Sequence, residues 1–244
     1  MLRLDWKTPA SWADAVLSDP LALLSDHAHC ELKAASAIQS LIVTYPDRLA
    51  LVQELGPVAV EEMQHFNQVV GVLVGRGHTL RAARPSPYAE GLGKAARQGR
   101  KDLMLDRLLV AGLIEERSFE RFELLAEHTT DGELEDLYRG LMVSEARHRR
   151  LFAQVAGNYY SRAEIETREQ ELRAVEAQVS ASSSRVKDRQ IDRYEWRRAP
   201  RPPRLPHPPL LSSWRLYPPR LPHLHDITYT HGVRVNSIEA TENL

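Results

Sequence analysis

The sequence predicts an all-α protein built as a four-helix bundle with a long crossover connection. Four long segments carry apolar residues at helical spacing, and only short connections separate the first from the second and the third from the fourth. Between the two pairs, residues 77–98 contain prolines and glycines among scattered basic residues, a composition too irregular for one helix and compatible with a long loop. Each pair is therefore expected to form an antiparallel hairpin, and the loop is expected to join the hairpins.

Helix signals divide the first 179 residues into elements. A capped turn is expected at residues 11–17, and the four bundle helices at residues 20–45, 47–76, 99–128 and 131–156. The Gly56-Pro57 pair should kink or split the second of these helices. Ser161 and Glu164 have the spacing of a capping box, which predicts a fifth helix at residues 162–179 that packs outside the bundle.

The composition changes after residue 180. Nine of the fifteen prolines lie between Pro200 and Pro222, interleaved with arginine and histidine and without helical or strand periodicity. We therefore expect a helical domain at residues 1–179 and a disordered, Pro/Arg-rich tail at residues 180–244. A tail without catalytic duty is the simpler interpretation, and an accessory RNA contact through its arginines is the alternative.

The overall composition excludes some classes of site. Lys+Arg at 32 against Asp+Glu at 33 leaves a formal charge of −1, so attraction to nucleic acid must come from local patches. A single cysteine, Cys30, excludes an internal disulfide and a thiolate metal cage, which fits a reducing compartment. No secretory signal and no membrane-spanning stretch is recognised, so we expect a cytoplasmic protein with no membrane contact.

Two Glu-x-x-His motifs are candidates for metal binding. Glu62 and His65 lie on one face of the second bundle helix, and Glu145 and His148 on one face of the fourth. Both motifs fall within the apolar stripe of their helix, which directs them into the core. A solvated surface is the ordinary place for such residues, so this shared phase favours a buried site.

The other two bundle helices each add one glutamate to an apolar stripe. Glu31 follows His27 by one turn in the first helix, and Glu115 lies between Ala111 and Phe119 in the third. Glu31 precedes Glu62 by 31 residues and Glu115 precedes Glu145 by 30, which suggests duplication of a helical hairpin. His27 is expected either to hydrogen-bond near Glu31 or to cap the helix entrance, and Glu61 to be a solvated or ion-paired neighbour.

Buried carboxylates need a compensating positive charge. An isolated ionised carboxylate in a protein core costs several kcal/mol, and four together repel one another. Two ferrous ions would supply +4 against −4, and oxygen ligands mixed with imidazole suit iron or manganese. Glutamates on facing helices of a bundle that bridge two metals are typical of di-iron proteins.

With these residues in view, the chain resembles the ferritin-like di-iron family of bacterial tRNA hydroxylases that act on 2-methylthio-N-isopentenyl adenosine. The resemblance extends over residues 1 to about 179. It rests on the sequences of residues 26–36, 61–66, 114–122 and 144–148, and on that of residues 85–92 in the crossover loop. It implies six metal ligands, which are Glu31, Glu62, His65, Glu115, Glu145 and His148. The Pro-rich tail departs from the family pattern.

The resemblance implies an O2-dependent monooxygenase that hydroxylates the isopentenyl group of the modified adenosine next to the tRNA anticodon. The expected cofactor is a di-iron centre, with O2 as co-substrate. Two electrons must come from an external donor, a reductase or ferredoxin, because the chain shows no dinucleotide fingerprint and no cysteine cluster.

An anticodon loop as substrate predicts basic contacts around the crossover. Lysines and arginines neutralise RNA phosphates, and residues 76–107 carry a local excess of them. The candidate tRNA contacts are Arg76, Arg81, Arg84, Lys94, Arg97, Arg100 and Lys101, with Arg107 in the same stretch. Two alternatives stay open at this point, a ferroxidase or rubrerythrin-like oxidoreductase and a non-catalytic, metal-stabilised helical RNA-binding protein.

Overall fold

Seven helices and no strand make up the described part of the chain. The computed structural model describes residues 3–83 and 85–191, with backbone alone at residues 100, 101 and 183–191. The helices are α1 (Ala10–Leu17), α2 (Pro20–Thr44), α3 (Leu49–Gly75), α4 (Pro87–Ala95), α5 (Arg100–His128), α6 (Gly132–Gly157) and α7 (Arg162–Ile191). The predicted all-α class is confirmed.

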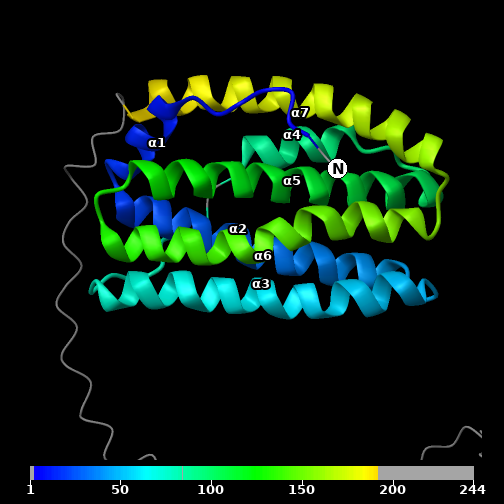
Figure 1. Ribbon diagram of the computed structural model, residues 1–244, viewed down its shortest axis with the longest axis horizontal. Coiled ribbons are helices and arrows are strands. Elements are labelled where there is room, and N and C mark those ends of the chain that lie inside the picture. The colour runs from blue at the N-terminus through cyan, green and yellow to red at the C-terminus, as the bar shows by residue number, and fades with distance from the viewer. Residues whose placement is uncertain (1–2, 84, 192–244) are drawn as a thin grey trace, which may run out of the picture. The chain divides into compact units, whose positions relative to one another are not determined.

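Helices α2, α3, α5 and α6 form a four-helix bundle (Figure 1). The most extensive packing is within the pairs α2–α3 and α5–α6, as the short connections predicted. The three remaining helices, α1, α4 and α7, lie on the α5 side, and α3 forms the opposite side (Figure 1). Helix α7 therefore packs outside the bundle, as expected.

The predicted helix starts are formed by side chains that accept backbone N–H groups. Asp19 accepts a hydrogen bond from the N–H of Ala22 at 3.0 Å, and Asp131 accepts from the first turn of α6. At the start of α7, the N–H of Ser161 donates to Glu164 at 2.8 Å and the N–H of Glu164 donates back to Ser161 Oγ at 3.3 Å. This reciprocal pair is the predicted capping box.

Helix α3 runs through the Gly56-Pro57 pair without being split. An internal proline lacks the N–H that would continue the ladder and costs about 3 kcal/mol in a helix interior. Leu55, Val58 and Ala59, on either side of Pro57, are buried in the core. Their packing on α2 and the rest of the bundle holds the helix together across the proline.

The crossover contains a helix that the sequence analysis did not predict. Ser86 caps α4 by accepting from the N–H of Ala89 at 3.3 Å, and Pro87 occupies the first turn. The glycines that suggested irregularity are helical, and Gly91 lies against α7. A Cβ at Gly91 would approach both γ-methyl groups of Val179 to 2.8 Å, so close packing of α4 on α7 requires glycine here.

Helix α7 continues to Ile191, beyond the expected end at residue 179. The expected end of this helix at residue 179 is therefore wrong, and the expected disorder of residues 180–244 stays a prediction. The reason lies in the run that follows Ser184, where Arg185, Val186 and Lys187 extend a helical composition. The expected disorder of the Pro-rich segment concerns residues 192–244 and lies outside the described residues.

Two hydrophobic clusters fill the bundle, one toward each end. The first contains Ile38 of α2, Val58 of α3 and Phe152 of α6, and the second contains Ala28, Val69 and Leu141 of the same three helices. Along every bundle helix, a short interval of buried polar residues separates the two clusters. This interval positions the candidate site in the middle of the bundle.

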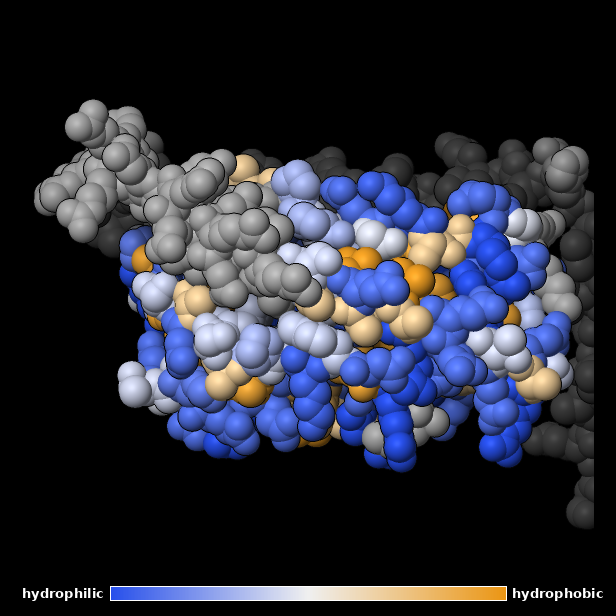
Figure 2. Space-filling view, turned by 90° about the horizontal axis from the view of Figure 1, so that it is seen from above, coloured by the Kyte–Doolittle hydropathy of each residue, from blue (hydrophilic) through white to orange (hydrophobic). Residues whose placement is uncertain are grey.

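No described helix is long and apolar enough to span a bilayer. Seen from above, on the side of α7, the surface is mostly hydrophilic with a small group of apolar residues near the middle (Figure 2).

Candidate metal centre

Six acidic and histidine side chains from four helices meet in the polar interval. They are Glu31 of α2, Glu62 and His65 of α3, Glu115 of α5, and Glu145 and His148 of α6, and none is more than 6% exposed. These are the six residues that the resemblance implied as ligands. The helical phases that predicted them therefore converge on one buried place.

The six side chains form two overlapping groups that could each hold a metal ion. One group contains Glu31, Glu62, His65 and Glu145, and the other contains Glu62, Glu115, Glu145 and His148. Within each group the ligand atoms lie within 4.8 Å of one another. Glu62 and Glu145 belong to both groups, which is the arrangement expected of carboxylates that bridge two ions.

Both imidazole rings present Nδ1 to the carboxylates. Nδ1 of His65 lies 3.6 Å from Glu145 Oε1 and 3.7 Å from oxygens of Glu31 and Glu62. Nδ1 of His148 lies 2.9 Å from Glu62 Oε1 and 4.0 Å from Glu145 Oε2. The two ring centroids are 5.9 Å apart, so the rings lie on neighbouring halves of one site.

Unsatisfied polar atoms show that the site fits a cation. Among the described residues, Glu62 Oε1, His65 Nδ1, Glu145 Oε2 and His148 Nδ1 are buried and make no hydrogen bond, although His148 Nδ1 and Glu62 Oε1 lie 2.9 Å apart. Buried polar atoms are normally paired, and these four belong to the two groups just described. Carboxylate oxygens and neutral imidazole nitrogens are ligands that iron and manganese accept, so the cluster is compatible with iron.

Burial and the neighbouring negative charges raise the pKa values of two of these carboxyl groups. Burial, together with the charges of Glu62 and Glu31, raises the pKa of Glu145 to about 8. Burial and the neighbouring Glu145 raise the pKa of Glu115 well above its usual value. Without a cation the site must therefore take up protons to reduce its negative charge, and a metal ion would replace them.

His65 balances part of that charge, and His27 contacts one of the carboxylates. Burial disfavours the charged ring of His65, but the negative charges of Glu31 and Glu62, whose oxygens lie 3.7 Å from its Nδ1, raise its pKa to about 9. His27 Nε2 lies 2.5 Å from Glu31 Oε1, and although burial works in the opposite direction, this contact lowers the pKa of Glu31. Of the two roles left open for His27, hydrogen bonding to Glu31 is the one observed.

The outer nitrogen of each candidate histidine ligand also has a partner. Nε2 of His148 lies 2.7 Å from Glu61 Oε2, and Nε2 of His65 lies 2.9 Å from Ser144 Oγ. Glu61 is ion-paired with Arg147, as expected, but its contact with His148 was not predicted. A signal was present, because Glu61 and Ser144 each directly precede the glutamate of a Glu-x-x-His motif.

A family model described as tRNA-(MS[2]IO[6]A)-hydroxylase (MiaE) matches residues 2–188. The chain belongs to this family. The match covers the whole bundle, with all six candidate ligands and α7 as far as residue 188. It thus accounts for the resemblance found in the motifs.

Relatives of this MiaE-family chain agree with the assignment. It is 39% identical over 175 residues to the tRNA 2-(methylsulfanyl)-N(6)-isopentenyladenosine(37) hydroxylase of Pseudomonas putida, covering 72% of this chain and 85% of that protein. An enzyme of the same name from Salmonella typhimurium is 29% identical over 228 residues, covering 73% and 83%. A solved structure, "Protein 43 with aldehyde deformylating oxygenase activity from Synechococcus", is 40% identical with a TM-score of 0.70, covering 72% and 88%.

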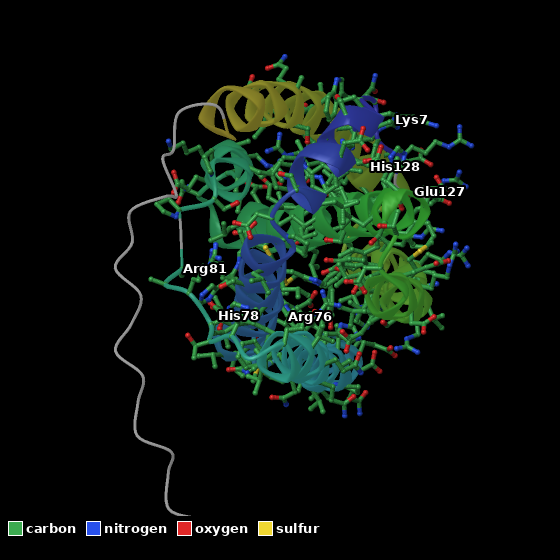
Figure 3. The ribbon with its side chains drawn as sticks, turned by 90° about the vertical axis from the view of Figure 1, so that its left-hand side faces the viewer. Lys7, Arg76, His78, Arg81, Glu127 and His128 are labelled. Carbon is green, nitrogen blue, oxygen red and sulfur yellow. The ribbon has the colours of Figure 1, made fainter. Side chains whose placement is uncertain are left out.

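In this MiaE-family chain, three of the predicted tRNA contacts are engaged in ion pairs. Arg76 contacts Asp131 and Glu133 at 2.7 Å, and Arg97 contacts Asp106 at 2.7 Å. Arg81 contacts Asp19 at 3.3 Å. Arg76 and Arg81 both lie at the bundle end shown in Figure 3. These pairs stabilise the crossover and the bundle end, and RNA binding by the same side chains stays a prediction.

Of the other predicted tRNA contacts, Lys94 and Arg107 have described side chains. Lys94 is exposed in the last turn of α4. Arg84 and the side chains of Arg100 and Lys101 lie outside the described residues. Arg107 of α5 donates to the carbonyl of Ala37 in α2 at 3.3 Å.

Proposed function

We propose that the chain is an O2-dependent di-iron monooxygenase that hydroxylates the isopentenyl group of 2-methylthio-N-isopentenyl adenosine beside the tRNA anticodon. The six buried side chains would hold the two iron ions, with Glu62 and Glu145 shared between them and Glu31 and Glu115 at the two ends. The observation that carries the proposal is the set of four unpartnered polar atoms within that cluster. Membership of the hydroxylase family supports the substrate.

The overall reaction balances with an external reductant. One oxygen atom of O2 enters an allylic C–H bond of the isopentenyl group, and the other leaves as water. The substrate C–H bond supplies two electrons, and a donor supplies two more with two protons. A di-iron centre, when bound, supplies the redox capacity for reducing O2 that amino-acid side chains lack.

The protein itself would contribute a site that is shielded from water and whose carboxylates match the charge of the bound ions. The hydrophobic clusters on either side of the six residues exclude bulk water from the interval between them. Low polarity strengthens every electrostatic contact inside, so the carboxylates keep their places once their charge is balanced. The pKa values of Glu115 and Glu145 are raised, so these two carboxyl groups keep their protons when no cation balances the charge of the site.

The tRNA and the electron donor would be external partners. Basic residues of the crossover would contact phosphates of the anticodon loop, with Lys94, Arg84, Arg100 and Lys101 as the candidates that add to the ion-paired arginines. A separate reductase or ferredoxin would deliver the electrons, because the sequence carries no second redox cofactor motif. We place the protein in the cytoplasm on the ground of its tRNA substrate.

Mass spectrometry of tRNA nucleosides tests the function. The chain is expressed in cells that make 2-methylthio-N-isopentenyl adenosine but lack a hydroxylase, and their tRNA is digested to nucleosides. We expect a product heavier by one oxygen atom, and none with Glu62→Ala or Glu145→Ala. A control with Glu54→Ala, which changes an exposed glutamate of α3, should hydroxylate normally. Absence of the product in cells that express folded protein contradicts the proposal.

Aldehyde deformylation is a second candidate, favoured by one specific observation. The Synechococcus protein with that activity is 40% identical to this chain over 72% of its length. Purified iron-loaded protein, given O2, a reductant and an aldehyde, should then consume the aldehyde. Aldehyde turnover without nucleoside hydroxylation would favour this candidate over the tRNA hydroxylase.

A further inference from the structure

Two hydrogen bonds cross the α3–α6 interface and hold the histidines from outside. Glu61 of α3 approaches Nε2 of His148 in α6 to 2.7 Å, and Ser144 of α6 approaches Nε2 of His65 in α3 to 2.9 Å. Each partner directly precedes the motif glutamate of its own helix. The contacts therefore occupy equivalent positions in the two halves, but one partner is a carboxylate and the other a hydroxyl.

The proton on His148 is placed by Glu61. Glu61 is partly exposed and ion-paired with Arg147, so it is ionised and can only accept hydrogen bonds. Nε2 of His148 must then carry a hydrogen, so in the neutral ring that binds a metal ion the lone pair lies on Nδ1. That Nδ1 is one of the unpartnered atoms directed at the carboxylates of the site.

Ser144 places the proton on His65 in the same way. The Ser144 hydroxyl donates its single hydrogen to the carbonyl of Leu141 at 2.8 Å. With its hydrogen directed to Leu141, Ser144 accepts from Nε2 of His65, which then carries a hydrogen. Once a metal ion replaces the proton on the ring, Nδ1 of His65, also unpartnered, can offer its lone pair to an ion held beside Glu145.

The two groups of candidate ligands, called here the His148 half and the His65 half, have outer partners of different charge. An imidazole that donates to a carboxylate is a stronger metal ligand than one that donates to a hydroxyl. Arg147 shares the oxygen of Glu61 but is 60% exposed, so water screens much of its effect. On the other half, Glu31 is engaged by His27 at 2.5 Å, which draws charge away from that carboxylate.

We propose that Glu61 and Ser144 are positioning residues that fix both histidines as Nδ1 ligands, and that the His148 half binds its metal ion more tightly and first. The inference rests on the proposed metal site but makes a separate claim about the order of loading. Each outer partner acts through a histidine and does not touch the ion. Loss of an outer partner typically weakens metal binding about 10- to 100-fold.

Titration of the full-length, metal-stripped protein with Mn2+ tests the order. Calorimetry measures the two affinities, and electron paramagnetic resonance distinguishes an isolated ion from a coupled pair. We expect two steps for the unmodified protein. Glu61→Ala should weaken the first step about 10- to 100-fold. Glu61→Gln keeps an acceptor oxygen but loses the charge, and should bring the two affinities closer together.

Ser144 variants test the other half. Ser144→Ala should weaken the second step only, and Ser144→Thr, which keeps the hydroxyl, should restore it. Glu54→Gln removes one negative charge from an exposed position of α3 and should leave both steps unchanged, which controls for net charge. Circular dichroism checks that each variant is folded.

Several results would overturn the inference. Unchanged affinities in folded Glu61→Ala and Ser144→Ala would do so, as would a Ser144→Ala effect on the first step. Failure of the unmodified protein to bind a metal pair would reject the metal site and this inference together. Ordered binding of two ions without any nucleoside hydroxylation would reject the proposed substrate and leave the inference standing.

Discussion

Arg117 of α5 makes a two-pronged contact with Glu176 of α7, in which Nε and Nη2 each donate to one carboxylate oxygen at 2.9 Å. Both side chains are buried. The same carboxylate accepts from Tyr88 of α4 at 3.1 Å and from Ser180 at 2.7 Å. Glu176 therefore joins the crossover helix and α7 to the bundle at a single buried point.

Removal of Glu176 should destabilise this junction strongly. Glu176→Ala leaves the buried Arg117 with Glu120 as its remaining carboxylate partner, and breaking a buried pair typically costs about 3–5 kcal/mol. Urea unfolding followed by circular dichroism measures the loss. The control is Glu166→Ala, in the exposed pair with Arg162, where no measurable change is expected because water screens the pair. Equal effects of the two substitutions would contradict a special role for Glu176.

Gly91 and Gly93 should respond oppositely to the same substitution. Gly91→Ala places a methyl group 2.8 Å from the branched side chain of Val179, and overpacking of this kind costs about 1–3 kcal/mol. Gly93 has open space around it in the same helix, so Gly93→Ala should stabilise by up to about 1 kcal/mol. Thermal unfolding of both variants measures the difference. A lower melting temperature for Gly93→Ala than for Gly91→Ala would argue against close α4–α7 packing.

The sequence was sufficient for the bundle and its six converging side chains because both follow from local periodicity. The phase of Glu62 and His65 against the apolar stripe of α3 is fixed within a few turns. Helix α4 could not be found in this way, because the place of Gly91 depends on packing against Val179, which lies far along the chain in α7. The contact between Glu61 and His148 likewise joins residues 87 positions apart and depends on which helices become neighbours.

The buried hydroxyl of Tyr138 should contribute little to stability. Its ring stacks beside His27 with centroids 5.6 Å apart, but its oxygen has no hydrogen-bond partner among the described residues. Tyr138→Phe removes an unsatisfied polar atom and keeps the ring, so the free energy of unfolding should stay equal or rise slightly. Tyr138→Ala should cost about 3–5 kcal/mol through the cavity it leaves. A large loss in Tyr138→Phe, measured by urea unfolding, would reveal a partner for the hydroxyl.

The stability of the metal-stripped protein should fall as the pH rises from about 5 to 9. The folded-state pKa of Glu145 is about 8 against an ordinary 4.5, and that of His65 is about 9 against 6.5. In this window the folded protein binds more protons than the unfolded chain, so raising the pH favours unfolding. The stabilisation from His65 is complete below its unfolded value of 6.5 and is lost as the pH passes 9. Glu31, whose pKa is lowered, acts oppositely and makes the protein less stable below its ordinary pKa of 4.5.

Metal binding should reverse this trend. Divalent ions replace the protons among the carboxylates and bind deprotonated ligands best, so the stabilisation that they add grows with pH. Melting temperatures measured at pH 6 and pH 9, with a chelator and with excess Mn2+, give the four values needed. The chelated protein should lose stability between these pH values and the metal-loaded protein should lose less or gain. A parallel decline in both would mean that the ions do not occupy the buried carboxylates.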